Sequence, residues 1–336
     1  MTDVNETRKH RKARTSIARL AAAAAMAAVL HTTNVHAADA RHINIGWQKG
    51  GNIAVIKVRG ELEKHLVAQG VSVTWLEFPA GPQMLEALNV GSIDFGTVGE
   101  TPPVFAQAAS DNLAYVGNDP PAPLAEAILV PKASPLHSVA DLRGKKVVLN
   151  KGSNVHYLLV RLLEKAGIKY GDVHGVDRSP ADARAAFESG SVDAWVIWDP
   201  FEAAAESQLG ARLLADGQGA ANNYIFYVAT RSYAEKNPGV IELLLHEING
   251  EEHWIEHNLK AAAAIIAPQI GVSNAIAETN LSHYAYGVKP LTDDVVRSQQ
   301  RIADVFYELK LIPRKIDIAS VVWHPSKQSE IVSGSH

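Results

Sequence analysis

Two short phrases of matching residue types, one in each half of the chain, combine side-chain hydrogen-bond donors with glycines. They are residues 48–53 (QKGGNI) and 150–155 (NKGSNV), and each follows an apolar run. This pattern predicts a strand that ends in a glycine-containing loop and opens a helix. The first turn of a helix has unpaired N–H groups and about half a positive charge, so it can hold an anion without lysine or arginine. Gln48, Ser153 and Asn154 would add side-chain donors.

A second pair of phrases predicts two further helix starts. Residues 91–94 (GSID) lead to Thr101-Pro102, and residues 190–193 (GSVD) lead to Asp199-Pro200. Thr101 could supply a hydroxyl to a ligand, whereas Asp199 is expected to cap its own helix. Trp198 could cover an apolar tail. Glycines at 50, 51, 99 and 152 would let a ligand oxygen approach the backbone, so the four starts together suit a small oxyanion.

Strand and helix patterns alternate from residue 43 to residue 230, which is typical of α/β folds with mostly parallel sheets. The repeated order predicts two similar lobes joined by crossover strands at 125–130 and 224–230, with a ligand cleft between them. Ligands bind outside the carboxyl ends of such strands. Helices are expected over 238–257, 259–267, 274–283 and 293–309, with Thr292 as the cap of the last one. This helical tail is expected to pack around the first lobe.

The ends of the chain and its composition point to export. Residues 1–37 have a basic start, an apolar run and a small-residue cleavage site, which is typical of a signal peptide. The chain has no cysteine, so it has neither a disulfide nor a cysteine for a lipid anchor. The formal net charge is −4 with the basic leader included, which disfavours nucleic acid and anionic membranes as partners. We therefore expect a soluble periplasmic protein.

Longer stretches of the chain resemble the aliphatic sulfonate-binding proteins of ABC importers, within the nitrate/sulfonate/taurine group. The matching stretches are 48–50, 78–83, 91–96, 99–103, 180–184, 198–200 and 222–224. The resemblance implies an α/β fold, periplasmic binding protein-like of type II, and the uptake of alkanesulfonates for sulfur. The ligand-binding positions that it implies are Gln48, Gly99, Glu100, Thr101, Gly152, Ser153, Asn154, Trp198, Asp199 and Tyr224. His156 and Asn222 would contact these ligand-binding residues without contacting the ligand.

These observations predict a domain plan and a set of partners. The signal peptide would cover 1–37, the first lobe 38–128 and 224–336, and the second lobe 129–223. The partners would be a small organosulfonate and the permease of an ABC transporter, with the binding protein acting as a monomer. We expect no cofactor and no metal.

Two alternatives stay open at this stage. The same fold could bind taurine, nitrate or a thiamine precursor, and related folds occur in enzymes of thiamine-pyrimidine synthesis. The lack of a complete catalytic motif argues against an enzyme. His246-Glu247 begins like the helix of a zinc protease, but Gly250 stands where the second histidine is needed.

Overall fold

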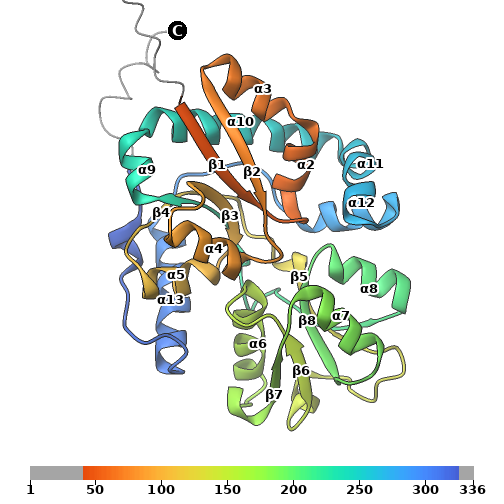
Figure 1. The fold of residues 1–336 in the computed structure, drawn as a ribbon. Helices are drawn as coiled ribbons and strands as arrows, with labels where there is room; N and C mark the ends of the chain where they lie inside the picture. The colour runs from red at the N-terminus through yellow and green to blue at the C-terminus, as the bar shows by residue number, and fades with distance from the viewer. Residues whose placement is uncertain (1–40, 325–336) are drawn as a thin grey trace, which may run out of the picture. The chain divides into compact units, whose positions relative to one another are not determined.

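The first of two β-sheets has the strand order β2-β1-β3-β10-β4. The structure is a computed structural model that describes residues 41–324, so the predicted signal peptide lies outside the described residues. β1 pairs in parallel with β2 and β3, whereas β10 runs antiparallel to β3 and β4. The strands are β1 (Arg41–Trp47), β2 (Val71–Glu77), β3 (Phe95–Gly99), β4 (Leu113–Asn118) and β10 (Ile225–Thr230), of which Figure 1 labels the first four.

The second sheet repeats this plan with the order β7-β6-β8-β5-β9. β6 is parallel to β7 and β8, and β5 is antiparallel to β8 and β9. The strands are β5 (Glu126–Val130), β6 (Lys146–Leu149), β7 (His174–Asp177), β8 (Ala194–Trp198) and β9 (Arg212–Asp216). The predicted α/β class and the internal duplication are confirmed. Each sheet is mixed, because its fourth strand in spatial order reaches it from the other half of the chain.

The two connections between the sheets run beside each other. Backbone hydrogen bonds join Asp119 N to Ile225 O at 2.9 Å, Ala122 N to Asn222 O at 3.0 Å and Gly217 N to Pro123 O at 2.9 Å. The predicted crossover at 125–130 is β5 of the second sheet, and the predicted return at 224–230 is β10 of the first. The connecting segments themselves are therefore 119–125 and 217–224.

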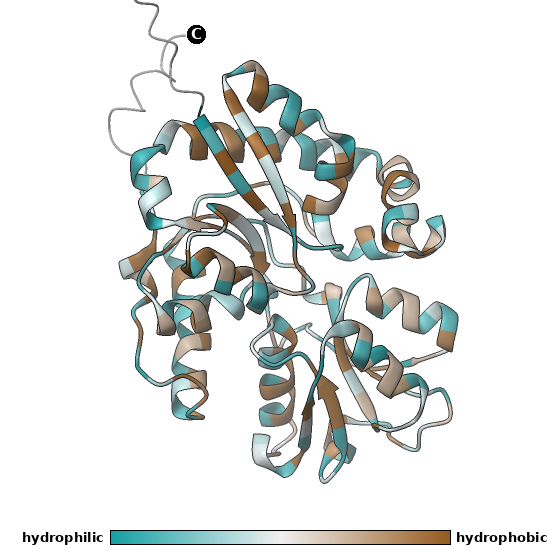
Figure 2. Ribbon diagram, viewed as in Figure 1, coloured by the Kyte–Doolittle hydropathy of each residue, from teal (hydrophilic) through white to brown (hydrophobic). Residues whose placement is uncertain are grey.

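Helices cover both faces of the first sheet, and β10 shows why. Its residues Phe226 and Val228 pack into one hydrophobic core, while Tyr227 and Ala229 pack into another on the opposite face. The helices are α2 (Gly51–Arg59), α3 (Glu61–Ala68), α4 (Gly81–Asn89), α5 (Pro102–Ala109), α9 (Arg231–Lys236), α10 (Pro238–His257), α11 (Leu259–Ile270) and α13 (Asp293–Glu308). A strand buried on both faces reads as a continuous apolar run, as residues 225–229 of β10 do. In Figure 2, β1 and β2 instead alternate between apolar and polar residues.

The remaining helices are α6 (Asn154–Lys165), α7 (Pro180–Glu188), α8 (Phe201–Leu209) and α12 (Asn274–His283), with short 3-10 turns at Pro123–Ala125, Val139–Leu142, Tyr170–Asp172 and Ile318–Val321. α6, α7 and α8 pack on the second sheet. α12 contacts α11 and α2 but also α8, so the helical tail touches both halves and not the first lobe alone.

Most predicted helix bounds agree with the structure, including those of α10 and α12. The apolar spacing of residues 53, 56, 62 and 66 predicts one helix over 52–69. In the structure this stretch is divided at Gly60, whose φ of 71° lies in the left-handed region. β9 and α9 were not predicted. Thr292 caps α13, because its hydroxyl accepts a hydrogen bond from Val295 N. Within residues 41–324 no single helix is long and apolar enough to span a membrane, and α11 with α12 meets that criterion only as a pair bent by 112°.

Candidate ligand-binding cleft

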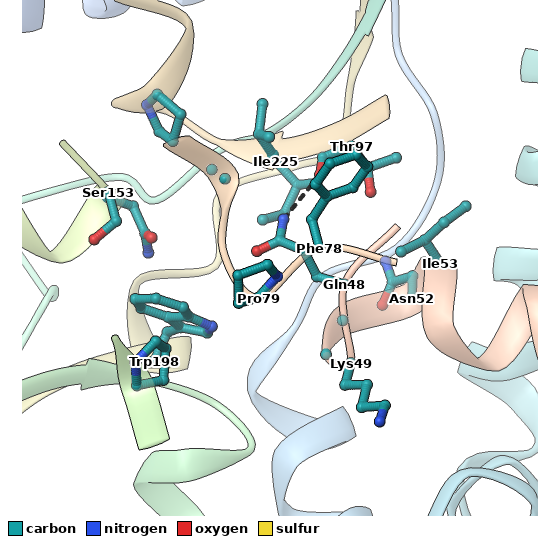
Figure 3. A pocket seen from close by; sticks show the side chains of 18 of the residues that line it. Gln48, Lys49, Asn52, Ile53, Phe78, Pro79, Thr97, Ser153, Trp198 and Ile225 are labelled. Atoms are coloured by element: carbon teal, nitrogen blue, oxygen red, sulfur yellow. Dashed lines mark hydrogen bonds between the residues drawn. The ribbon is translucent and has the colours of Figure 1, made fainter. Parts of the chain in front are cut away.

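A cleft of about 210 Å³ lies at the carboxyl ends of strands from both sheets. That volume is below the usual range for pockets that take drug-sized ligands and indicates a small ligand. Figure 3 shows Trp198 and Ser153 on one side of it and Gln48 and Pro79 on the other. The first half of the fold contributes residues 48–53, 77–79, 81, 97–99, 102, 119, 225, 227 and 284, and the second contributes 153, 154, 179–181, 198 and 201, with Asn223 between them.

Five of the ten predicted ligand-binding residues line this cleft. These are Gln48, Gly99, Ser153, Asn154 and Trp198. The other five are not among its lining residues: Glu100, Thr101, Gly152, Asp199 and Tyr224. His156 and Asn222, which were expected to lie behind the ligand positions, do not line it either. Whether each lining residue touches a ligand stays a prediction.

Two helices that begin at the cleft present free backbone donors. Within residues 41–324, no acceptor lies within hydrogen-bond distance of the N–H groups of Gly51, Asn52 and Ile53 at the start of α2. The same holds for Asn154 N and Val155 N at the start of α6. α2 belongs to the first half of the fold and α6 to the second. The cleft therefore has one anion-binding helix start from each half.

The other two predicted helix starts offer fewer donors. α5 begins with Pro102 and Pro103, which have no N–H, and Thr101 makes no capping hydrogen bond. At α8, Asp199 Oδ1 accepts from Ala203 N at 3.0 Å, as expected for a carboxylate that serves its own helix. Free backbone donors are therefore found at two of the four predicted helix starts, since proline removes the donors at α5 and the Asp199 carboxylate serves its own helix, as expected.

The side-chain donors at the start of α6 already have acceptors within the protein. Ser153 Oγ donates to Asn150 O at 2.7 Å. Asn154 Nδ2 donates to Glu126 Oε2 at 2.7 Å and to Asn223 Oδ1 at 3.0 Å. These bonds hold the helix start in place and leave the backbone N–H groups of α6 as its free donors. Across the cleft, Gln48 Nε2 donates to Thr97 O at 3.2 Å, the dashed line in Figure 3.

His156 supports the loop before α6. Its Nδ1 accepts a hydrogen bond from Gly152 N at 3.1 Å, and its Nε2 lies 2.8 Å from the Tyr170 hydroxyl. Burial lowers the pKa of His156 to about 4, so the ring is neutral at physiological pH. The Gly152 amide is thus directed at the ring and away from the cleft. Through these two hydrogen bonds His156 fixes the loop before α6.

Glycines in the predicted phrases lie where the two halves of the fold approach each other. A Cβ on Gly99 would lie 2.8 Å from Asn154 Cβ, and one on Gly50 would lie 3.2 Å from Asp199 O. A Cβ on Gly152 would lie 3.7 Å from Pro82. At Gly99 above all, the absence of a side chain allows the first half to contact the second. Close approach of protein to protein is thus a second role for glycines that sequence reasoning assigned to ligand contact.

Two buried carboxyl groups lie beneath the cleft. Glu100 Oε2 accepts from Tyr224 N at 3.2 Å, and burial raises the pKa of Glu100 to about 7. Glu126 bonds Asn154, and burial together with the charge of Glu100 raises its pKa well above the ordinary value. Among the described residues, neither group's Oε1 has a hydrogen-bond partner. Glu126 thus holds the start of α6, and Glu100 holds the segment before β10.

Aromatic side chains from both halves of the fold line the cleft. Trp198 makes an edge-to-face pair with Phe201, with ring centroids 6.3 Å apart, and Phe78, Tyr227 and Tyr284 are the other aromatic residues of the described lining. Sequence reasoning found Trp198 but missed the other four as cleft residues. Phe78 lay within a stretch that carried the family resemblance, and its place after β2 was the available signal. Tyr284 follows α12, far along the chain from any phrase, so no local signal indicated it.

The lining has little positive charge. Lys49 is the one lysine or arginine among the described lining residues, and it forms an ion pair with Glu77 at 3.1 Å while about half exposed. An anion in the cleft therefore depends on backbone N–H groups and neutral donors.

Comparison with known proteins gives consistent matches over most of the chain. The family model described as NMT1/THI5 like matches residues 66–250. A protein of Escherichia coli (strain K12), named as an aliphatic sulfonates-binding protein, is 45% identical over 287 residues, 85% of this chain and 89% of that one. A protein of Bacillus subtilis (strain 168) with the same name is 30% identical over 285 residues, 84% of this chain and 86% of that one.

A solved structure agrees with these matches. The alkanesulfonate-binding protein SsuA from Xanthomonas axonopodis pv. citri, bound to MOPS, superposes with a TM-score of 0.82 at 42% identity, over 85% of this chain and 99% of that one.

Proposed function

This chain belongs to the family of aliphatic sulfonate-binding proteins, within the NMT1/THI5-like group, and on that premise we propose that it captures alkanesulfonates for an ABC importer. The ligand would bind in the cleft between the two halves of the fold. Its sulfonate would accept hydrogen bonds from the first turns of α2 and α6, and its carbon tail would lie against Trp198. The close relatives of the chain are binding proteins.

One observation carries the proposal. Two helix starts with free N–H groups, one from each half of the fold, open on the same cleft. Each helix start acts as about half a positive charge, so two of them match the single negative charge of a sulfonate. The aromatic side chains of Trp198 and Phe78, one from each half, offer apolar surface to an organic tail. Nitrate has no tail to place there, which favours a sulfonate over a bare inorganic ion.

The proposal includes a location and a partner. The relative from Escherichia coli whose structure is solved is a periplasmic aliphatic sulphonate binding protein, and the basic and apolar composition of residues 1–37 supports export through a cleaved signal peptide. The mature chain would act as a monomer and deliver its ligand to a permease in the inner membrane. Because a sulfonate contacts both halves only when they are close, binding would favour the closed arrangement.

Isothermal titration calorimetry on the mature protein tests this function. We expect ethane-, butane- and hexanesulfonate to bind, with affinity that rises by up to about fourfold per added CH₂ while the tail is buried. Sulfate and nitrate should bind much more weakly. Tight binding of the inorganic ions without binding of the sulfonates would rule the function out.

A variant of Trp198 tests the proposed position of the ligand's carbon tail. Trp198→Ala should reduce the affinity gained per CH₂ and weaken hexanesulfonate more than ethanesulfonate. Tyr307→Ala is the matched control, because Tyr307 is an exposed aromatic residue on α13 outside the cleft. Equal losses for the short and the long ligand in Trp198→Ala would show that the tail lies elsewhere.

A further inference from the structure

Four buried polar side chains form a connected cluster on the α2 side of the cleft. Asn52 Nδ2 donates to Asp119 Oδ2 at 3.3 Å and to Glu252 Oε1 at 3.1 Å. The Tyr227 hydroxyl donates to Glu252 Oε1 at 2.5 Å, and Gly287 N donates to its other oxygen at 2.7 Å. Asn52, Asp119 and Tyr227 line the cleft, whereas Glu252 lies behind them.

Two oxygens of this cluster have no hydrogen-bond partner. Asn52 Oδ1 and Asp119 Oδ1 are buried without a donor among residues 41–324. The side chains are only 6% and 1% exposed. Because the Asn52 NH₂ group is directed at two carboxylates, its oxygen is left as an acceptor. A buried acceptor without a partner is unfavourable, so these two oxygens would be stabilised by a ligand that donates hydrogen bonds to them.

The cluster also lacks a positive charge. Its two carboxyl groups come from Asp119 and Glu252, and the residues bonded to them are an amide, a phenol and a backbone N–H. The nearby Arg59 pairs with Glu251 at 2.6 Å. A ligand group with several N–H donors and a positive charge would satisfy both unpaired oxygens and offset the carboxylate charge. An ammonium group has three donors and no acceptor.

We propose that Asn52 and Asp119 recognise a protonated amine on the ligand tail, so that the cleft selects aminoalkanesulfonates among the alkanesulfonates. This inference rests on the proposed function and adds a second anchor to it. The sulfonate binds at the starts of α2 and α6, and the ammonium donates to Asn52 Oδ1 and Asp119 Oδ1. A tail that ends in a methyl group leaves these acceptors unpaired, which is how a polar site rejects an apolar analogue.

One competing arrangement uses the same residue differently. Burial and the charge of Glu252 raise the pKa of Asp119 well above its ordinary value in the unliganded protein. A protonated Asp119 could donate to the sulfonate itself. In that arrangement Asp119 would serve every sulfonate equally, whereas an ammonium site serves only amines.

Matched ligands on the unaltered protein test the inference. Taurine and 1-propanesulfonate differ by an ammonium in place of a terminal methyl, and so do 3-aminopropanesulfonate and 1-butanesulfonate. Calorimetry at pH 7 should show at least one amine binding roughly tenfold or more tightly than its methyl partner, as expected for hydrogen bonds to a charged group. Methyl ligands that bind as tightly as the amines in both pairs would overturn the inference and leave the sulfonate function standing. Failure of all four ligands would instead refute the function itself.

A variant assigns the preference to the cluster. Asp119→Asn should remove most of the amine advantage, so that the affinity for taurine falls several-fold more than the affinity for 1-propanesulfonate. Asp111→Asn is the control, because Asp111 is exposed and pairs with Arg314 outside the cleft. A parallel loss for both ligands in Asp119→Asn would overturn the ammonium site. Thermal melting shows whether the variant folds, and if it does not, the matched ligands on the unaltered protein still decide.

Discussion

A methyl group at position 99 should weaken ligand binding without unfolding the protein. Gly99 ends β3 in the first half of the fold and faces Asn154 at the start of α6 in the second half. In Gly99→Ala the added Cβ would lie 2.8 Å from Asn154 Cβ and 3.0 Å from its Cγ. The backbone of Gly99 is not in the left-handed region, so alanine fits the local conformation. The change therefore acts on the contact between the two halves.

The size of the effect follows from that contact. Carbon atoms pack at about 3.5–4.0 Å, so the two halves have to separate by roughly 1 Å at this point. An extra methyl in a tightly packed contact typically costs about 1–3 kcal/mol. Because an open arrangement relieves the clash, this penalty falls on the closed, ligand-bound arrangement. We expect sulfonate affinity to fall roughly 5- to 150-fold.

Calorimetry and small-angle X-ray scattering measure the two parts of this prediction. Gly99→Ala should bind sulfonate more weakly and show a smaller decrease in radius of gyration on ligand addition, with a melting temperature close to that of the unaltered protein when no ligand is present. Gly171→Ala is the control, because a Cβ there meets no atom within 4 Å and its φ is not positive. Unchanged affinity in Gly99→Ala, within twofold, would refute the reasoning.

Two further predictions concern stability. His283 Nδ1 lies 2.5 Å from Asp199 Oδ2, and this hydrogen bond raises the pKa of His283 above 6.5. The pair thus stabilises the fold fully below pH 6.5 and loses its effect as the pH rises through the raised pKa, so His283→Gln should lower the melting temperature more at pH 6 than at pH 9. An equal decrease at both values would contradict this. Thr292→Ala removes the cap of α13 and should destabilise by about 1 kcal/mol, or roughly 2 °C in calorimetry. Thr279→Ala, on the exposed face of α12, should not, and equal losses would argue against the cap.

The duplicated architecture could be predicted from sequence because its signals are local. An apolar run, a glycine and a donor-rich helix start are all read within a few residues, and they recur in the same order. The structure places the repeated phrases at equivalent points of two sheets with the same strand order. The antiparallel strands β5 and β10 could not be assigned in this way, since an apolar run does not show which sheet it joins.

The state of the donors in the cleft depends on residues far away in the sequence. Asn154 is a good donor by residue type, but its NH₂ group is occupied by Glu126 and Asn223, which belong to other segments. Asp119 was not considered at all, because it follows β4 without any phrase around it. Its importance appears only when Asn52 and Glu252 are seen beside it. Residue types thus indicated which side chains could donate hydrogen bonds. Which of these donors lack an acceptor within the protein depends on contacts between distant segments.

The lack of backbone donors at the start of α5 could have been predicted from the sequence. Pro102 and Pro103 lack N–H groups, so the start of α5 could never equal that of α2 as an anion site. The free donors that remain at the predicted sites belong to α2 and α6, one in each half. Each half then contributes one helix start with about half a positive charge. In the proposed function, ligand capture and the approach of the two halves would therefore be one event, and the contact of Gly99 with Asn154 would limit how close that approach can be.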